Sequence, residues 1–312
     1  MRLTRPRTTL IAILGLLAVA LIGAGCGSSN NNSTSTSGGK AVQQTATPGI
    51  NVAKDPKIAA EVPKSISSTG TLSVAADATY PPDEFIAPDG KTVIGMDADL
   101  AKAIGQVMGL KVDVQNITFD SIIPGLAANK YDLGMSSFTD TKEREQTVDF
   151  VTYLTAGTSF YVKADGGPDI VGFESLCGHS AAVERGTIQA DAIAEQDKKC
   201  KSAGKPAVDL QVLPDQNAAN LAISSGRAEV GAADTPVAVY IAEQSNGQFK
   251  VVGKPVPPEP YGIAIPKDNG MAQPVLDAVK AVMADGAYKK ILDYWGLQQG
   301  AISNPTINGA VS

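Results

Sequence analysis

The sequence predicts an α/β fold built as two lobes. From about Thr69 onward, short apolar strands alternate with amphipathic helices, which is the pattern of largely parallel sheets covered by helices. The alternation runs through two similar cycles, and this suggests one sheet for each lobe. Residues 69–312 are numerous enough to form two separate cores.

A turn and a helix mark the first cycle. Asp89-Gly90 lies between two short apolar runs, which predicts a hairpin. From Asp99 to Met108 the apolar residues recur at helical spacing, and Gly109 follows as the C-terminal stop. The other expected elements of this cycle are strands at 72–75, 111–114 and 131–135 and a helix at 121–129.

The second cycle follows an extended segment at 149–163. Gly226 is expected to end one helix, and Pro236 suits the first turn of the next, where no N–H is needed. The other expected elements are strands at 181–183, 208–213, 229–231, 248–252 and 261–265, helices at 189–199 and from 217, and two final helices, the last at 288–294. Crossings between the lobes are expected near 154–158 and 257–261.

The N-terminus predicts export. Arg2, Arg5 and Arg7 precede an unbroken apolar run at 10–22, and Gly23-Ala-Gly-Cys26 follows as a small-residue cleavage site. As a helix the apolar run would rise only about 20 Å, which is too short to span a bilayer. A cysteine directly after the small residues resembles the lipobox of bacterial lipoproteins, in which Cys26 is diacylated. The alternative is a plain secretory signal with an incidental cysteine.

A polar linker follows that cysteine. Residues 27–39 contain no apolar side chain to bury, and prolines punctuate the continuation as far as residue 68. We therefore expect a lipoprotein signal peptide at 1–25 and a disordered tether at 26–68 that holds the folded part at a membrane surface.

The two other cysteines, Cys177 and Cys200, form an even pair in an oxidising compartment. A disulfide between them would contribute roughly 3 kcal/mol by restricting the unfolded chain. Two buried free thiols are the alternative. No metal site is expected, because His179 is the only histidine and two thiols make an incomplete zinc shell.

Charge argues against a nucleic-acid partner. The chain has 26 basic and 32 acidic residues, and the basic ones form no stripe along the sequence. An acidic balance of this size otherwise indicates a soluble folded part. We see no nucleotide or redox motif, and no cofactor is expected.

One segment predicts a carboxylate site. An apolar strand is expected to end at Met135, and the hydroxyls of Ser137 and Thr139 are followed by Arg144 at an expected helix start. Hydroxyls, backbone N–H groups and a guanidinium suit a carboxylate. Asp234 offers the opposite charge in the second cycle, so the two segments together suit a zwitterion such as a free amino acid. The alternatives are a solvated arginine and an aspartate that only caps a helix.

With these pieces in order, the chain resembles the family 3 periplasmic solute-binding proteins, the receptors of polar amino acid ABC importers. The resemblance runs from about Leu72 to Gly296 and rests on motifs in a fixed order. They are Asp77-Ala-Thr-Tyr-Pro-Pro-Asp-Glu-Phe85, Gly95-Met-Asp-Ala-Asp-Leu100, Phe119-Asp-Ser-Ile-Ile-Pro-Gly-Leu126, Ser136 to Arg144, Arg185-Gly-Thr187, Asp234-Thr-Pro236, Tyr261-Gly-Ile-Ala-Ile-Pro266 and Gly286-Ala-Tyr…Trp295-Gly.

The resemblance implies a two-lobed periplasmic-binding-protein type II fold, with two mostly parallel sheets joined by a two-strand hinge. The implied boundaries are 69–155 and 260–299 for lobe 1, 156–259 for lobe 2 and 300–312 for a C-terminal tail. A monomer is expected.

It also implies how the backbone end of an amino acid is held. Arg144 is similar to the family arginine that pairs with the ligand α-carboxylate, and Ser137 and Thr139 match the donors beside it. Thr187 matches a residue of the second lobe that adds donors to the same carboxylate. Asp234 matches the aspartate that takes the α-ammonium.

The side-chain end of the ligand is implied less narrowly. Tyr80 and Phe119 match two aromatics that sandwich the aliphatic part, and Asp77 matches a residue that reaches the far end. If Glu184 also faces the cleft, that end is acidic, which favours arginine, lysine, ornithine or glutamine over glutamate and aspartate. If Glu184 points to solvent, glutamine leads. Ordinary core roles for Tyr80 and Phe119, and a turn-forming role for Asp77, are the alternatives.

The implied function is an extracytoplasmic receptor that captures a polar amino acid and delivers it to an ABC permease with its ATPase, anchored to the membrane through lipid on Cys26. The alternatives are a sensory amino acid-binding ectodomain and a dehydratase on the same scaffold, and glutamate is the alternative ligand. Catalysis is not expected, because it needs a positioned general acid, and His179 lies beside Cys177, away from the cleft motifs.

Overall fold

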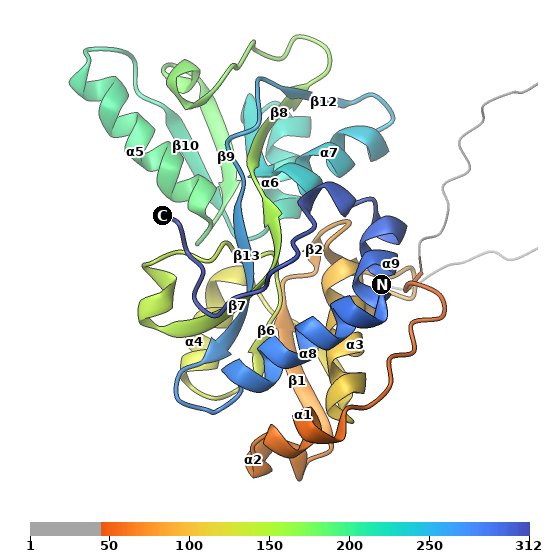
Figure 1. The fold of residues 1–312 in the computed structure, drawn as a ribbon. Helices are drawn as coiled ribbons and strands as arrows, with labels where there is room; N and C mark the ends of the chain where they lie inside the picture. The colour runs from red at the N-terminus through yellow and green to blue at the C-terminus, as the bar shows by residue number, and fades with distance from the viewer. Residues whose placement is uncertain (1–44) are drawn as a thin grey trace, which may run out of the picture. The chain divides into compact units, whose positions relative to one another are not determined.

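The computed structural model describes residues 45–312 (Figure 1). The predicted signal peptide at 1–25, the lipidation of Cys26 and the first part of the predicted tether lie outside the described residues. Within the described part, no helix combines the length and the apolar character needed to cross a membrane.

Two five-stranded sheets form the two lobes (Figure 1). The first sheet consists of β1 (Thr71–Ala76), β5 (Lys111–Asn116), β6 (Leu133–Gly134), β7 (Val148–Ala156) and β13 (Glu259–Pro266). The second consists of β8 (Thr158–Lys163), β9 (Ser180–Glu184), β10 (Asp209–Leu213), β11 (Val230–Asp234) and β12 (Phe249–Val252). Their spatial orders are β5-β1-β6-β13-β7 and β10-β9-β11-β8-β12.

The predicted two-lobed α/β class is confirmed, but the sheets are mixed and not mostly parallel as predicted. In each spatial order the first two pairings are parallel and the last two are antiparallel. The antiparallel pairings arise where the chain passes between lobes without a crossover helix: β8 enters the second lobe and β13 returns to the first, each against the direction of its parallel neighbour.

Helices cover both faces of each sheet. On the first sheet α3 (Met96–Met108), α8 (Ala272–Asp285) and α9 (Ala287–Trp295) pack on one face and α4 (Phe119–Ala127) on the other. On the second sheet α5 (Ile188–Ser202) packs on one face, and α6 (Gln216–Ser224) and α7 (Thr235–Gln244) pack on the other. Side chains alternate between the two faces of β1. Leu72 and Val74 therefore pack into the core under α3, and Ala75 packs into the core under α4.

The remaining elements are short. A three-stranded sheet contains β2 (Thr79–Tyr80), β3 (Glu84–Ile86) and β4 (Val93–Ile94), with the predicted Asp89-Gly90 turn between β3 and β4. Single-turn 3-10 helices are η1 (Arg144–Gln146), η2 (Phe173–Leu176) and η3 (Gln298–Gly300). The helix expected to start near Arg144 is therefore one turn only, because the β-branched start of β7 follows at once.

The described chain passes between the two sheets twice, from β7 to β8 and from β12 to β13, close to the predicted crossings. Gly157 separates β7 from β8. A Cβ on this residue would lie 2.0 Å from the carbonyl oxygen of Val256, on the segment that leads back to the first sheet. Glycine is thus required where the two connecting segments lie against each other.

The second part of the predicted tether is folded, so the expectation of disorder up to residue 68 is wrong for residues 45–68. This segment forms α1 (Pro56–Glu61) and α2 (Lys64–Ser67), and Ile58, Val62 and Ile66 are buried in the core of the first lobe. The prolines were misleading, because Pro56 occupies the first turn of α1, where proline is favoured. The apolar residues recur every four positions, which is the signal that the composition obscured.

The C-terminal residues lie along β7, the edge strand of the first sheet. Ala301 and Ile307 form single bridges with Leu154 and Val151, and the backbone N–H of Phe150 donates to the side chain of Asn308 at 2.8 Å. The predicted tail at 300–312 therefore covers a strand edge that would otherwise expose unpaired N–H and C=O groups.

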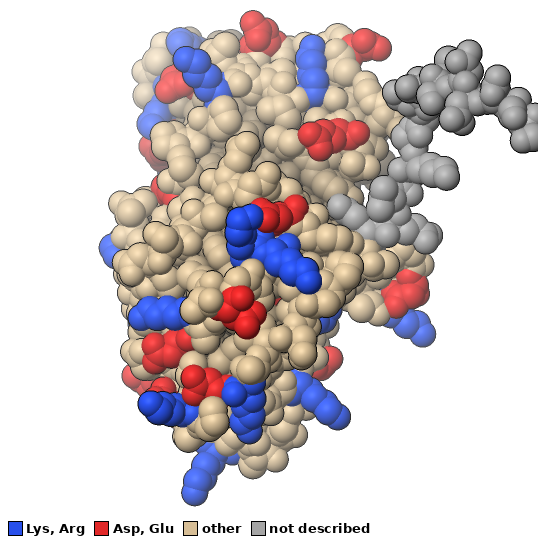
Figure 2. Space-filling view, turned by 45° about the vertical axis from the view of Figure 1, so that its right-hand side comes forward, with Lys and Arg blue, Asp and Glu red and all other residues tan. Residues whose placement is uncertain are grey.

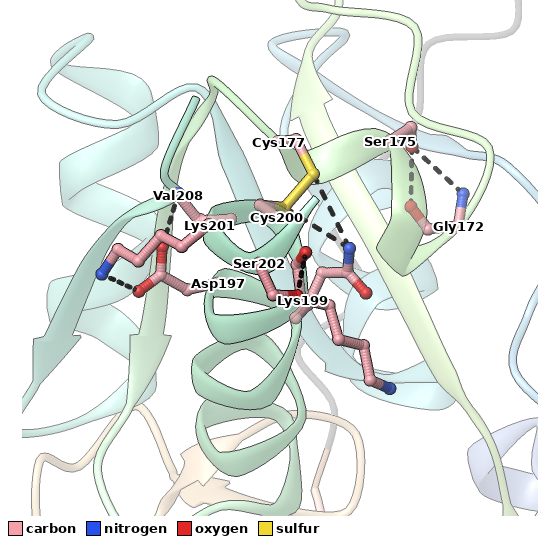
Figure 3. The surroundings of a disulfide bond; sticks show 10 residues. Gly172, Ser175, Cys177, Asp197, Lys199, Cys200, Lys201, Ser202 and Val208 are labelled. Carbon is pink, nitrogen blue, oxygen red and sulfur yellow. Dashed lines mark hydrogen bonds and ion pairs between the residues drawn. A yellow bond between two sulfur atoms is a disulfide. The ribbon is translucent and has the colours of Figure 1, made fainter. Parts of the chain in front are cut away.

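A disulfide joins Cys177 and Cys200, as predicted, across a sequence separation of 23 residues (Figure 3). It ties the segment after η2 to the last turn of α5. The side-chain amide of Gln196, one turn earlier on α5, lies 3.4 Å from the sulfur of Cys200. The disulfide therefore links η2 to α5 on the outside of the second lobe.

On the face that Figure 2 shows, basic and acidic side chains are interspersed, and no continuous stripe of either sign runs across it.

We expect residues 45–68 to stabilise the first lobe. A version of the chain that begins at Thr69 loses the buried Val52, Ile58, Val62 and Ile66, each worth about 1.5–3 kcal/mol when fully buried. Its melting temperature should be at least about 5 °C below that of a version beginning at Thr45, since 1 kcal/mol shifts a protein of this size by about 2–4 °C. Differential scanning calorimetry of the two versions measures this, and equal melting temperatures would contradict it.

Candidate ligand-binding site

A small cavity lies between the two lobes. It is lined by Tyr80, Phe119, Ser137, Thr139, Arg144, Thr187, Ile188, Gln189, Gln216, Ala232, Ala233, Asp234 and Val237. The cavity volume is about 20 Å³, which is room for a water molecule but not for an amino acid. The two lobes are therefore closed on each other, and a larger molecule enters only when they separate.

The structure brings the predicted site residues together. All of them line the cavity except Asp77 and Glu184, which are buried behind Tyr80. The sequence analysis missed Gln189 and Gln216. Each stands in the first turn of a helix, Gln189 two residues after the capping Thr187 and Gln216 directly after the capping Asp215, a position that places polar groups at the carboxyl end of a preceding strand.

Arg144 holds backbone groups of both lobes. Its Nη1 donates to the carbonyl oxygen of Thr139 at 2.8 Å, and its Nη2 donates to that of Gly186 at 3.0 Å. The guanidinium carbon lies 5.4 Å from the ring centroids of both Phe119 and Phe138. Burial lowers the pKa of Arg144 from its ordinary value, and the negative charge of Asp234 opposes that shift.

Asp234 faces this guanidinium from the second lobe. It ends β11 and precedes α7, but its side chain makes no capping hydrogen bond to that helix. Its Oδ1 instead accepts from Nε2 of Gln189 at 2.8 Å, and the same Nε2 donates to the hydroxyl of Thr158 at 2.8 Å. Burial raises the pKa of Asp234 to about 6, against hydrogen bonding and the charge of Arg144.

Thr187 caps α5, and its hydroxyl already makes two hydrogen bonds within the protein. Its Oγ1 accepts from the backbone N–H of Ala190 at 3.2 Å and donates to the carbonyl oxygen of Glu184 at 2.8 Å. What it presents to the cavity is the N-terminal end of α5, whose dipole favours negative charge.

Aromatic rings form one wall of the cavity. Tyr80 and Phe119 meet edge to face with centroids 5.8 Å apart, and Phe119 stacks on Phe138 at 4.5 Å. Tyr80 and Phe119 are almost fully buried and also line the cavity, so they are core residues and wall residues at once.

Two carboxyl groups lie behind Tyr80. Asp77 is 2% exposed, and its two oxygens accept from the hydroxyl of Thr79 at 2.7 Å and from the backbone N–H of Phe119 at 2.9 Å. Glu184 is 1% exposed, and neither of its oxygens has a hydrogen-bond partner. Burial, followed by the charge of Asp77, raises the pKa of Glu184 to about 9. The solvent-facing alternative for Glu184 is therefore excluded.

A second group of buried carboxyls, which the sequence analysis did not predict, lies beneath Ser137. Asp83, Glu84 and Asp97 are at most 1% exposed. The Ser137 hydroxyl lies 3.0 Å from Asp83 Oδ2 and 3.2 Å from Glu84 Oε2, and its backbone N–H donates to Asp97 Oδ2 at 3.0 Å. Among the residues that the structure describes, no set of three His, Cys, Asp or Glu side chains has the arrangement of a metal site.

Residues 72–298 match the sequence model of a protein family, the bacterial extracellular solute-binding proteins, family 3. The chain is 33% identical over 254 residues to the arginine-binding protein ArgT of Corynebacterium glutamicum, covering 81% of this chain and 83% of that protein. It is similar to the solved structure of an ancestral arginine-binding protein bound to arginine, with a TM-score of 0.67 and 34% identity over 72% of this chain and 98% of that one. It is also similar to the ancestral amino acid-binding protein AncCDT-1, a precursor of cyclohexadienyl dehydratase, with a TM-score of 0.67 and 35% identity over 74% of this chain and 98% of that one.

We expect the carboxyls beneath Ser137 to make stability fall as the pH rises. Burial raises the pKa values of Asp83, Glu84 and Asp97, the last to about 6, so the folded protein binds their protons more tightly than the unfolded chain does. This stabilisation is complete below the unfolded pKa values of about 4 and is lost as the pH rises through the folded values.

Asp83→Asn keeps an acceptor for Ser137 and removes one charge. Relative to the unmodified chain it should gain on the order of 1–2 kcal/mol of unfolding free energy between about pH 5 and pH 8. Urea unfolding at several pH values measures the difference, with Asp165→Asn, at an exposed position, as the control. Parallel pH profiles for Asp83→Asn and the unmodified chain would refute the expectation.

Proposed function

The chain belongs to the bacterial extracellular solute-binding proteins of family 3, and we propose that it is an amino acid receptor of an ABC importer whose ligand carries a basic side chain, arginine first. The observation that carries the proposal is the distribution of charge at the cavity. Arg144 and Asp234 face each other across it, and two further buried carboxyls, Asp77 and Glu184, lie behind its aromatic wall.

The backbone end of an amino acid fits Arg144 and Asp234. A guanidinium has five N–H donors in a planar fork, and a carboxylate takes two of them in parallel. A ligand carboxylate would replace the carbonyl oxygen of Gly186 as partner of Nη2. The α-ammonium would give Asp234 a cationic partner beside the neutral side-chain amide of Gln189, from which its Oδ1 accepts a hydrogen bond.

The basic side chain follows from Asp77 and Glu184. A cationic end group near these carboxyls would neutralise buried negative charge and supply the donors that Glu184 lacks. Glutamine is the second candidate, because its amide can donate to Glu184 without carrying charge. Glutamate would add a third carboxylate to the same place and is disfavoured.

Capture by closure explains how such a ligand is retained. In the closed arrangement Arg144 bonds the carbonyl of Gly186 across the cleft, and Arg185 lies 3.5 Å from Asp120 on the opposite lobe. A ligand that contacts both lobes stabilises this arrangement by its differential contacts there. The bending is proposed to occur at the two connecting segments that meet at Gly157.

A dehydratase on the same scaffold is the rival function, and the position of His179 argues against it. His179 precedes β9 and lies 3.3 Å from Glu229, which precedes β11. Glu184 and Asp234 stand at the other ends of the same two strands. The only imidazole of the chain is thus at the wrong end of the sheet to act as an acid or base in the cleft.

We also propose that lipid on Cys26 anchors the receptor at the outer face of the membrane and that the chain acts as a monomer. Support for the anchor is the arrangement of a positive segment, an apolar run and a small-residue site that ends in cysteine. A tethered receptor remains close to its permease, which raises the effective concentration of the pair.

Calorimetric titration of a soluble form that begins at Gly27 tests the ligand. We expect arginine to bind at least tenfold more tightly than glutamine, which corresponds to about 1.4 kcal/mol, and glutamate to bind least. Lysine and ornithine should lie between arginine and glutamine. A preference for glutamate, or saturation by none of these amino acids, would overturn the assignment.

Arg144→Ala should weaken ligand binding by about 2–5 kcal/mol, because it leaves a buried ligand carboxylate without a partner. Arg144→Lys should recover only part of this loss, since an ammonium cannot form the bidentate pair. Arg227→Ala, at an exposed position away from the cavity lining, is the matched control. Unchanged affinity in Arg144→Ala would remove this residue from the site.

A further inference from the structure

Within the described part of the chain, Glu184 is buried with no cation beside it to balance a negative charge. It is 1% exposed and neither carboxylate oxygen accepts a hydrogen bond. The titratable groups that act on it from the surrounding elements are Asp77 after β1, Tyr80 of β2, Tyr161 of β8 and Asp215 before α6. The carboxyls of Asp77 and Asp215 oppose a negative charge on Glu184, the Tyr80 hydroxyl favours one, and no cation is among these groups, so burial and the two carboxyls together keep the pKa of Glu184 raised.

The nearest positive charge along the chain is directed elsewhere. Arg185 follows Glu184, but its guanidinium lies 3.5 Å from Asp120 and is largely exposed. The Tyr161 hydroxyl donates to Asn220 at 2.6 Å and so offers Glu184 no proton.

Asp77 and Glu184 are not equivalent. Asp77 accepts hydrogen bonds from the Thr79 hydroxyl and from the backbone N–H of Phe119, and both favour its ionised form. Glu184 accepts none. Of the two carboxyls, Glu184 is therefore the one that carries the proton, and the raised pKa of about 9 agrees with this order.

We propose that binding of an amino acid with a cationic side chain expels the proton of Glu184, whereas a ligand with a neutral side chain leaves that proton in place. The inference rests on the proposed function and adds to it a proton-linked selection of ligand charge. The O–H bond of the Glu184 carboxyl breaks, its proton passes to the solvent, and the carboxylate pairs with the ligand cation. No other bond is made or broken. With an amide or ureido ligand the carboxyl keeps its O–H as a donor to the ligand oxygen.

Linkage gives this selection a pH dependence with a definite sign. One proton released per ligand makes affinity rise about tenfold per pH unit while the pH stays below the pKa of Glu184. Arginine binding should therefore strengthen between about pH 6 and pH 8 relative to citrulline, the neutral ligand of the same length and shape. The two ligands share their α-groups, so protons exchanged at Arg144 or Asp234 cancel in the comparison.

The experiment is a titration of the soluble form that begins at Gly27 with arginine and with citrulline, in phosphate and in Tris at pH 7. Because these buffers differ in ionisation enthalpy, the change in apparent binding enthalpy between them counts the protons released. We expect arginine to release about one more proton than citrulline. In Glu184→Gln that difference should fall to near zero, and the ratio of arginine to citrulline affinity should no longer change with pH.

The possible results distinguish failure of the proton link from failure of the proposed receptor function. Arginine binding with the same proton count as citrulline in the unmodified chain would overturn the proton link and leave the receptor assignment standing. An undiminished difference in Glu184→Gln would also overturn it, because the proton would then come from another group. If neither ligand binds, the proposed function fails and this inference fails with it.

Discussion

Buried negative charge is the constraint on which the cleft depends. Asp234 lines the cavity, and Asp77 and Glu184 are buried behind its aromatic wall. Asp83, Glu84 and Asp97 lie beneath Ser137. Arg144 is the only basic residue among those that line the cavity. An ionised carboxylate without a partner is far more costly to bury than a neutral one. The folded protein must therefore hold protons on several of these groups or receive a cation there. That requirement explains why the pKa values rise throughout this region, and it makes a cationic ligand the natural complement of the closed lobes.

The fold places these charges by a simple rule of strand direction. Asp77 follows β1, Glu184 ends β9 and Asp234 ends β11, so each stands at the carboxyl end of a strand that has a parallel neighbour. In open α/β sheets these ends are where ligands bind, because the loops that leave them are free of the sheet and face the crevice. Because the two sheets are joined at Gly157, the carboxyl ends of their strands face each other, and the cavity lies between them.

Sequence reasoning recovered the strands, the helices and most of the cavity lining, because periodicity, glycine stops and ordered motifs are local signals. It failed where a local signal has two meanings. Pro56 indicates a linker or the first turn of a helix, and only burial of Ile58 against the first lobe distinguishes them. Asp83 and Glu84 follow two prolines, a pattern typical of an exposed turn, yet they are fully buried under Ser137. Whether Glu184 is buried depends on the partner lobe, about which its own neighbours in the sequence carry no information.

The two sets of buried carboxyls differ in their hydrogen bonding, and this difference indicates a structural role for one set and ligand binding for Glu184. Those beneath Ser137 accept hydrogen bonds from Ser136 and Ser137, so their oxygens help to hold the segment that leads to Arg144. The carboxyl of Glu184 accepts none. A group of that kind destabilises the protein, and natural chains tolerate such groups chiefly where binding or chemistry uses them. The outer layers of the lobes are reinforced by the disulfide, by the folded segment at 45–68 and by the C-terminal residues along β7. Stability supplied there offsets the cost of keeping an unsatisfied carboxyl between the lobes for a ligand.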